Sequence, residues 1–142
     1  MSNVIFTASA TAKNGREGHV KSEDGLIDLN LVNPAEDKEA QGKGSNPEQL
    51  FAAAYSACFD ATINMIASQQ NKTVDSETTA QVSFCKDPED NGFKIAAKLN
   101  VKIKGVNPEE AEELVEKAHQ GCPYSKATRG NIDVELHAEA VE

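Results

Sequence analysis

Short runs of apolar and β-forming residues open the chain, and turn signals separate them. Residues 4–13 are rich in Thr, Ala and β-formers and end at Asn14-Gly15, a hairpin signal. A second turn, Glu23-Asp24-Gly25, precedes residues 26–31, where leucine and isoleucine alternate with polar residues. The pattern predicts three short antiparallel strands, followed by a loop over residues 33–45 in which no periodicity appears.

A long helix is predicted after this loop. Asn46 suits the N-cap, Pro47 suits the first helical position, and Gln49 completes a variant capping box. The helix is expected to run to about Ser68, and its first half is apolar nearly all round. Such a helix is expected to lie buried in the centre of the fold.

The second half of the chain alternates between strand and helix patterns. Residues 73–86 and 92–104 predict two long strands joined by a turn-rich segment. Asn107 begins an amphipathic helix with Gly121 as its C′ residue, and residues 132–136 predict a closing strand. The order βββ-α-ββ-α-β predicts an α+β fold with antiparallel sheets around a central helix.

Chain length and composition limit the possible architectures. A chain of 142 residues is predicted to form a single domain over residues 1–142. It has no Trp and only seven Phe and Tyr in all, so its core is expected to be modest and to leave room for burial at a subunit interface. The formal net charge of −9 opposes binding to nucleic acid.

The cysteine count and the N-terminus bear on the compartment. No basic region or apolar signal core opens the chain, and no stretch is expected to approach the ~18 apolar residues of a membrane span. Three cysteines without a CxxC motif favour free thiols in a reducing compartment, and a general disulfide oxidoreductase is disfavoured. We therefore expect a cytoplasmic protein with no membrane partner.

Cys58 lies in the apolar part of the long helix, where burial is expected to raise its pKa. A reactive thiolate there needs a cation, and Arg16 is the better placed of the two arginines. Glu48 is able to hold the Arg16 guanidinium bidentately. In a continuous helix, however, Glu48 and Cys58 are separated by about 15 Å of rise. Arg16 is able to bridge part of the gap, but a break in the helix or a Glu48 from a second subunit would bridge it more naturally; we favour a site shared at a dimer interface.

Cys122 stands in a different setting, since Cys122-Pro123 predicts a helix N-cap with Pro at the first position. An accessible thiol there suits thiol exchange. One buried nucleophile and one accessible partner are what a peroxide-reducing dithiol needs, because the second thiol condenses with the sulfenic acid of the first.

The segments 46–59 (NPEQLFAAAYSACF) and 122–132 (CPYSKATRGNI) resemble the organic hydroperoxide resistance (Ohr) branch of the Ohr/OsmC family. The resemblance extends over essentially the whole chain and departs from the family pattern at Ala54 and Lys126. It implies an intertwined homodimer that reduces organic hydroperoxides, with no bound cofactor and with a lipoyl-bearing protein or other dithiol as reductant. It also implies that Cys58 is the peroxidatic cysteine and Cys122 the resolving cysteine, with Arg16 and Glu48 activating the thiolate.

Apolar side chains near the two cysteines suit a hydrophobic substrate. The predicted substrate-binding residues are Phe51, Ala54, Phe59 and Tyr124. The rival function is a redox sensor or ligand-binding module in which Cys58 and Cys122 cross-link without turnover.

Each candidate residue also has a structural interpretation. Cys58 is then a small core residue, Cys122 a structural thiol, Glu48 a complement to the helix dipole and Arg16 a solvated turn residue. Cys85 is interpreted as a bystander. The three histidines show no ligand spacing, so no metal site is predicted, and the glutamates of the second helix are expected to form its solvated face.

Overall fold

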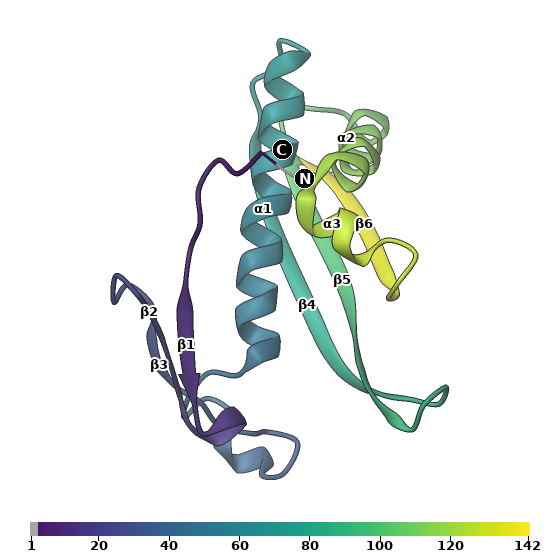
Figure 1. The fold of residues 1–142 in the computed structure, drawn as a ribbon. Helices are drawn as coiled ribbons and strands as arrows, with labels where there is room; N and C mark the ends of the chain where they lie inside the picture. The colour runs from purple at the N-terminus through teal and green to yellow at the C-terminus, as the bar shows by residue number, and fades with distance from the viewer. Residues whose placement is uncertain (1–2) are drawn as a thin grey trace. The chain divides into compact units, whose positions relative to one another are not determined.

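The structure is a computed structural model that describes residues 3–142, and its fold is α+β with two three-stranded sheets (Figure 1). The chain forms two compact units, one ending at Leu50 and the other spanning Phe51–Glu142. The first two residues of the predicted single domain over 1–142 lie outside the described part, and that domain assignment stays a prediction. The α+β class predicted from the sequence is confirmed.

The first unit contains the predicted three-stranded antiparallel sheet. Its strands are β1 (Ala10–Lys13), β2 (His19–Ser22) and β3 (Asp28–Asn30), in the order β1-β2-β3. Both outer strands are shorter than predicted, because β1 pairs with β2 only from residue 10 onward and β3 over three residues. Short 3₁₀ helices follow β1 (Gly15–Glu17) and β3 (Lys38–Ala40).

Helix α1 (Pro47–Gln69) begins where the sequence predicts. The side chain of Asn46 accepts a hydrogen bond from the Gln49 backbone N–H at 2.8 Å, which is the expected N-cap. The reciprocal half of the predicted capping box is replaced, because the Gln49 side chain accepts instead from the Ser45 hydroxyl at 2.7 Å. The start of the helix therefore depends on Asn46 and on the residue before it.

The second unit is built on the sheet β4-β5-β6, whose strands are β4 (Asp75–Asp87), β5 (Gly92–Lys104) and β6 (Val134–Val141). The pair β4 and β5 is antiparallel along its whole length, as predicted. The pair β5 and β6 is parallel, which corrects the expectation of a wholly antiparallel sheet. Helices α2 (Pro108–Gly121) and α3 (Pro123–Thr128) form the crossover that a parallel connection requires.

The core of the second unit lies where α1 and α2 pack on the sheet (Figure 1). The residues of α1 that contribute are Tyr55, Phe59, Thr62, Ile63 and Ala67. Strand β5 contributes alternate residues, Ala97, Leu99, Val101 and Ile103, and α2 contributes Ala111, Leu114, Val115 and Ala118. The buried positions repeat every two residues on the strand and every three to four residues on the helix, as the hydrophobic pattern of the sequence indicates.

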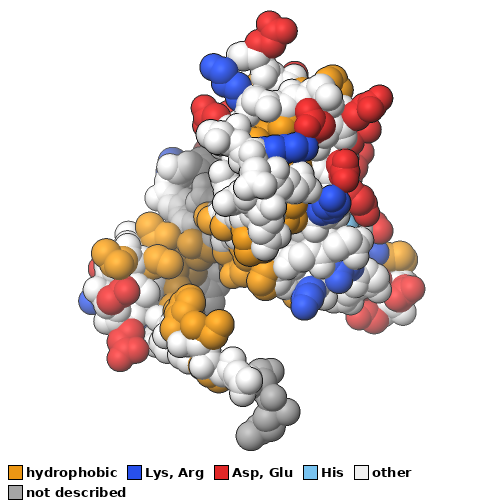
Figure 2. Space-filling view, turned by 90° about the horizontal axis from the view of Figure 1, so that it is seen from above, with side chains coloured by type: hydrophobic (Ala, Val, Ile, Leu, Met, Phe, Trp, Pro, Cys, Tyr) orange, Lys and Arg blue, Asp and Glu red, His pale blue; other side chains and the backbone are white. Residues whose placement is uncertain are grey.

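Helix α1 is only partly covered within the described residues. Ala53, Ala57 and Ala61 on its other side are exposed, and Met65 is 52% exposed, so the helix is not enclosed as the sequence predicted. Other apolar side chains also reach the surface (orange, Figure 2). By length and composition α1 is apolar enough to cross a bilayer, with a mean hydropathy of 1.3, contrary to the expectation for this chain. The core helix of a soluble protein meets the same criterion, and one face of α1 packs in the core.

Candidate active site

The second unit brings Cys58 and Cys122 together. Cys58 lies in the middle of α1, and Cys122 lies at the junction of α2 and α3, 64 positions later. Their sulfur atoms are 3.6 Å apart, with the Cys122 thiol donating toward the Cys58 sulfur. Both are free thiols in the structure. A disulfide has sulfur atoms about 2.05 Å apart, so the pair is close enough to form one after a small movement.

The burial of the two thiols is the reverse of the prediction. Cys122 is completely buried, whereas Cys58 is only half-buried. Cys122 belongs to the buried core cluster of the second unit. Its backbone is bonded to both neighbouring helices, since its N–H donates to the Ala118 carbonyl and its carbonyl accepts from the Lys126 N–H. It also caps α2, so Gly121 is the last residue of that helix rather than its C′ residue. Cys122 is therefore the buried thiol, and Cys58 is the more accessible one.

The surroundings of Cys58 within its unit favour the neutral thiol. Burial raises the pKa of Cys58, as predicted, and the hydrogen bond with Cys122 raises it further. A hydrogen bond from the Tyr124 backbone N–H acts in the opposite direction and lowers the pKa of Cys58. Sequence reasoning missed this backbone donor, which depends on how α3 is placed beside α1. A reactive Cys58 thiolate therefore requires a further source of positive charge.

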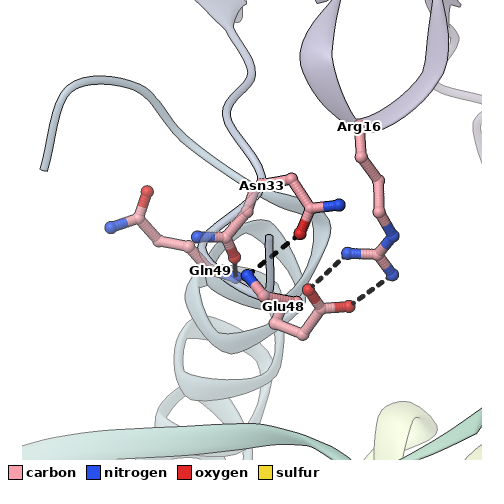
Figure 3. Close-up of polar contacts among 6 residues, drawn as sticks. Arg16, Asn33, Glu48 and Gln49 are labelled. Carbon is pink, nitrogen blue, oxygen red and sulfur yellow. Dashed lines mark hydrogen bonds and ion pairs between the residues drawn. The ribbon is translucent and has the colours of Figure 1, made fainter. Parts of the chain in front are cut away.

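The first unit forms the predicted ion pair between Arg16 and Glu48 (Figure 3). Two parallel hydrogen bonds join the guanidinium to the carboxylate, at 2.7 and 3.0 Å. Hydrogen bonding to Arg16 lowers the pKa of Glu48, and the same hydrogen bonds raise the pKa of Arg16. The Arg16 side chain keeps 36% of its surface exposed and Glu48 keeps 16%. Glu48 thus fixes the guanidinium, and the Arg16 side chain stays partly exposed.

The hairpin loop that carries Arg16 is specified by its sequence. Asn14 and Gly15 both have positive φ, 61° and 60°, a conformation that glycine and asparagine adopt most readily. A side chain at Gly18 would collide with the backbone carbonyl of Lys13, since a Cβ there would lie 1.7 Å from its oxygen. The turn predicted at Asn14-Gly15 is therefore confirmed, and Arg16 extends from its 3₁₀ segment rather than from a strand.

The four predicted catalytic side chains form two pairs, each within its own unit. Arg16 pairs with Glu48, and Cys58 pairs with Cys122. Helix α1, which carries both Glu48 and Cys58, runs without a break from Pro47 to Gln69. The alternative in which a break in the helix brings Glu48 to Cys58 is therefore wrong.

Three of the predicted substrate-binding residues belong to an aromatic cluster. Phe51 contacts Tyr124 with ring centroids 6.1 Å apart, and Tyr124 is 37% exposed. Phe59 is completely buried in the core, and the fourth predicted residue, Ala54, is half-buried on α1. Tyr55 lies at the centre of the cluster, with its ring 6.0 to 6.3 Å from those of Phe51, Phe59 and Tyr124. The apolar setting is thus built around Tyr55, a residue that sequence reasoning did not select.

The remaining candidates lie outside these pairs. Among residues 3–142 no group of three or more His, Cys, Asp or Glu side chains is arranged to hold a metal ion. Cys85 lies half-buried on β4. Glu109, Glu112, Glu113 and Glu116 are on the exposed face of α2, and acidic side chains are prominent on the surface in Figure 2. These glutamates are the solvated helix face that the charge pattern predicted.

Comparison with known proteins gives a consistent result. Residues 40–137 match the family model described as OsmC-like protein. The chain is 53% identical to the organic hydroperoxide resistance protein OhrB of Bacillus subtilis, over 93% of this chain and 96% of that one. It is 45% identical to the organic hydroperoxide resistance protein of Xanthomonas axonopodis pv. citri, over 94% of each chain.

Solved structures of organic hydroperoxide resistance proteins are also similar to this chain. The crystal structure of Bacillus subtilis OhrB has a TM-score of 0.89 at 50% identity, covering 97% of this chain and all of the other. An organic hydroperoxide resistance protein from Legionella pneumophila has a TM-score of 0.88 at 46% identity, covering 96% of this chain and 99% of that one.

Proposed function

The chain belongs to the OsmC family, and from that premise we propose that it is a thiol-dependent peroxidase that reduces organic hydroperoxides to alcohols. The observation that carries the proposal is the 3.6 Å separation of Cys58 and Cys122, two free thiols 64 positions apart in the sequence. The choice of substrate class rests on the names of the relatives, which are organic hydroperoxide resistance proteins. The aromatic side chains of Phe51 and Tyr124 suit an apolar substrate.

The proposed reaction has two steps on the protein. The Cys58 thiolate attacks one oxygen of the hydroperoxide, the O–O bond breaks, and the alcohol leaves after taking up a proton, so that Cys58 becomes a sulfenic acid. The Cys122 sulfur then attacks the Cys58 sulfur, and the sulfenic hydroxyl leaves as water with the thiol proton. A disulfide remains, and the hydroperoxide has been reduced by two electrons.

Arg16 and Glu48 are proposed to activate Cys58. Burial and the neighbouring thiol raise the pKa of Cys58 within its unit, so the thiolate needs a cation. Arg16 is suited to this role because Glu48 fixes its guanidinium bidentately while the side chain stays partly exposed. Arg16 would stabilise the thiolate and orient the peroxide, and Glu48 would act by holding Arg16.

We further propose a homodimer in which the activated site is shared between chains. Support comes from the exposed small and apolar residues of α1, which have no cover within the described chain, and from the unbroken helix between Glu48 and Cys58. Mixing a Cys58→Ser chain with a Glu48→Ala chain tests this. Recovered activity in the heterodimer supports a shared site, and no recovery would place both residues of one site in the same chain.

The disulfide has to be reduced by an external dithiol, for which a lipoyl-bearing protein is the proposed source. No bound cofactor enters the proposed reaction, since both electrons come from the Cys58 and Cys122 thiols. Free thiols of this kind persist in a reducing compartment, and the cytoplasm is the proposed location.

Turnover separates the peroxidase from a redox sensor that uses the same cysteines. The protein is mixed with excess dihydrolipoamide and an alkyl hydroperoxide, and alcohol formation is followed with wild type and Cys58→Ser. A peroxidase forms many equivalents of alcohol per chain, and Cys58→Ser forms none. One equivalent at most from wild type would identify a sensor.

A further inference from the structure

Three buried hydroxyl groups join α1 to α3 next to the cysteine pair. The Tyr55 hydroxyl on α1 is 2.8 Å from the Ser125 hydroxyl and 3.1 Å from that of Thr128, both on α3. All three residues are at most 3% exposed. Ser125 lies three residues after Cys122, in the first turn of the helix that Cys122 caps. The cluster therefore ties the segment that carries Cys122 to the helix that carries Cys58.

Side chains around the α2–α3 junction support the same segment. His119, in the last turn of α2, is 2.9 Å from the Ser125 hydroxyl through its Nδ1. Arg129, which follows α3, donates to the His119 carbonyl at 2.8 Å. Hydrogen bonds from α2 and from the end of α3 thus support the junction at Cys122, and the Tyr55 hydroxyl joins it to α1.

An isolated hydrogen-bond cluster in a core has only a structural role, but the position of this one adds a further consequence. A six-residue helix such as α3 is too short to be stable by itself and takes its position from its contacts. The gap between the Cys58 and Cys122 sulfurs depends on where α3 lies against α1. Tyr55 is within hydrogen-bond distance of two α3 residues, Ser125 in the first turn after Cys122 and Thr128 at the end of the helix.

We propose that Tyr55 is a positioning residue for disulfide formation: its hydroxyl holds α3 so that Cys122 stays within reach of oxidised Cys58. The inference rests on the proposed function. Once Cys58 is a sulfenic acid, two reactions compete for its sulfur. Cys122 attacks it to form the disulfide and water, or a second hydroperoxide transfers an oxygen to it, giving a sulfinic acid and an alcohol. Tyr55 favours the first reaction by geometry alone.

The test replaces Tyr55 by Phe, which keeps the ring contacts and removes the hydroxyl. Wild type and Tyr55→Phe, both with Cys85→Ala, are oxidised by increasing concentrations of an alkyl hydroperoxide without reductant. Intact-mass analysis then separates disulfide, which has lost two hydrogens, from sulfinic acid, which has gained two oxygens. A misplacement of about 1 Å is able to slow a reaction up to about a hundredfold. Formation of the Cys58–Cys122 disulfide in Tyr55→Phe is therefore expected to slow about ten- to a hundredfold.

Thr78→Val is the matched control. The Thr78 hydroxyl also joins α1 to a neighbouring element, since it donates to the Asp60 carboxylate on α1 at 2.8 Å. Thr78 lies on β4, however, and not on α3. It should lower stability comparably and leave the ratio of disulfide to sulfinic acid unchanged. Thr128→Val removes a partner of Tyr55 and should raise the sulfinic fraction as Tyr55→Phe does, which keeps the test available if Tyr55→Phe does not fold.

The outcomes are distinguishable. A raised sulfinic fraction in Tyr55→Phe or Thr128→Val, with wild-type behaviour in Thr78→Val, supports the inference. Equal fractions in all folded variants, or the same rise in Thr78→Val, overturn it while the peroxidase proposal stands. If wild-type Cys58 is not oxidised at all, the proposed function fails, and the inference fails with it.

Discussion

Oxidation of Cys58 and Cys122 to a disulfide is expected to raise the free energy of unfolding. The cross-link would close a loop of 64 positions. In the chain-entropy model a loop of that length removes enough freedom from the unfolded chain to add about 4 kcal/mol at most. The sulfur atoms have to approach from 3.6 Å to about 2.05 Å, a movement of about 1.5 Å, and the strain of that movement lowers the gain.

The assay is denaturant unfolding of the oxidised and the fully reduced protein at equal concentration, in a Cys85→Ala background so that one disulfide is able to form. Equal concentration matters because the stability of the proposed homodimer would depend on it. The oxidised form should unfold at higher denaturant, by up to about 4 kcal/mol after linear extrapolation. Cys58→Ser should show no response to the oxidant. A disulfide form less stable than the dithiol form would contradict the reasoning, because strain would then exceed the entropic gain and the thiols would not be pre-positioned.

Three further predictions concern the charges and the exposure of the site. Arg16→Ala should raise the pKa of the Cys58 thiol, so that the rate of hydroperoxide attack rises only at higher pH, and an unchanged pH-rate curve would remove Arg16 from the mechanism. Because Arg16 lowers the pKa of Glu48, the stability from this pair is present above the usual range of a carboxyl group and is lost as the pH falls through the lowered pKa of Glu48. For a partly exposed pair this contribution to stability amounts to about 1 kcal/mol or less. Thermal unfolding of Glu48→Gln and wild type should therefore differ more at neutral than at acidic pH. An equal difference at the two pH values would argue against the contribution. In the reduced protein an alkylating reagent should label Cys58 before Cys122, as peptide mapping would show, since Cys122 is fully buried; the reverse order would contradict the burial described.

Local signals gave much of the fold. The N-cap at Asn46, the positive-φ turn at Asn14 and the amphipathic second helix each depend on a few neighbouring residues, and the structure has them at those positions. The bidentate pair of Arg16 and Glu48 was also predictable, because the chain has only two arginines.

What the sequence could not predict depends on packing between distant segments. The parallel pairing of β6 with β5 follows from the direction of the crossover, to which the alternating pattern of a strand is insensitive. The burial of Cys122 and the hydroxyl cluster at Tyr55 both follow from the docking of α3 on α1, about 70 positions away. A tyrosine in an alanine-rich helix carries no local sign of such partners.

The most direct test of the central claim is a stopped-flow comparison of an alkyl hydroperoxide with hydrogen peroxide, using reduced wild type and Cys58→Ser. Wild type is expected to react much faster with the alkyl hydroperoxide than with hydrogen peroxide, and Cys58→Ser is expected to lose the fast reaction. Equal slow rates with both peroxides in wild type would contradict the claim.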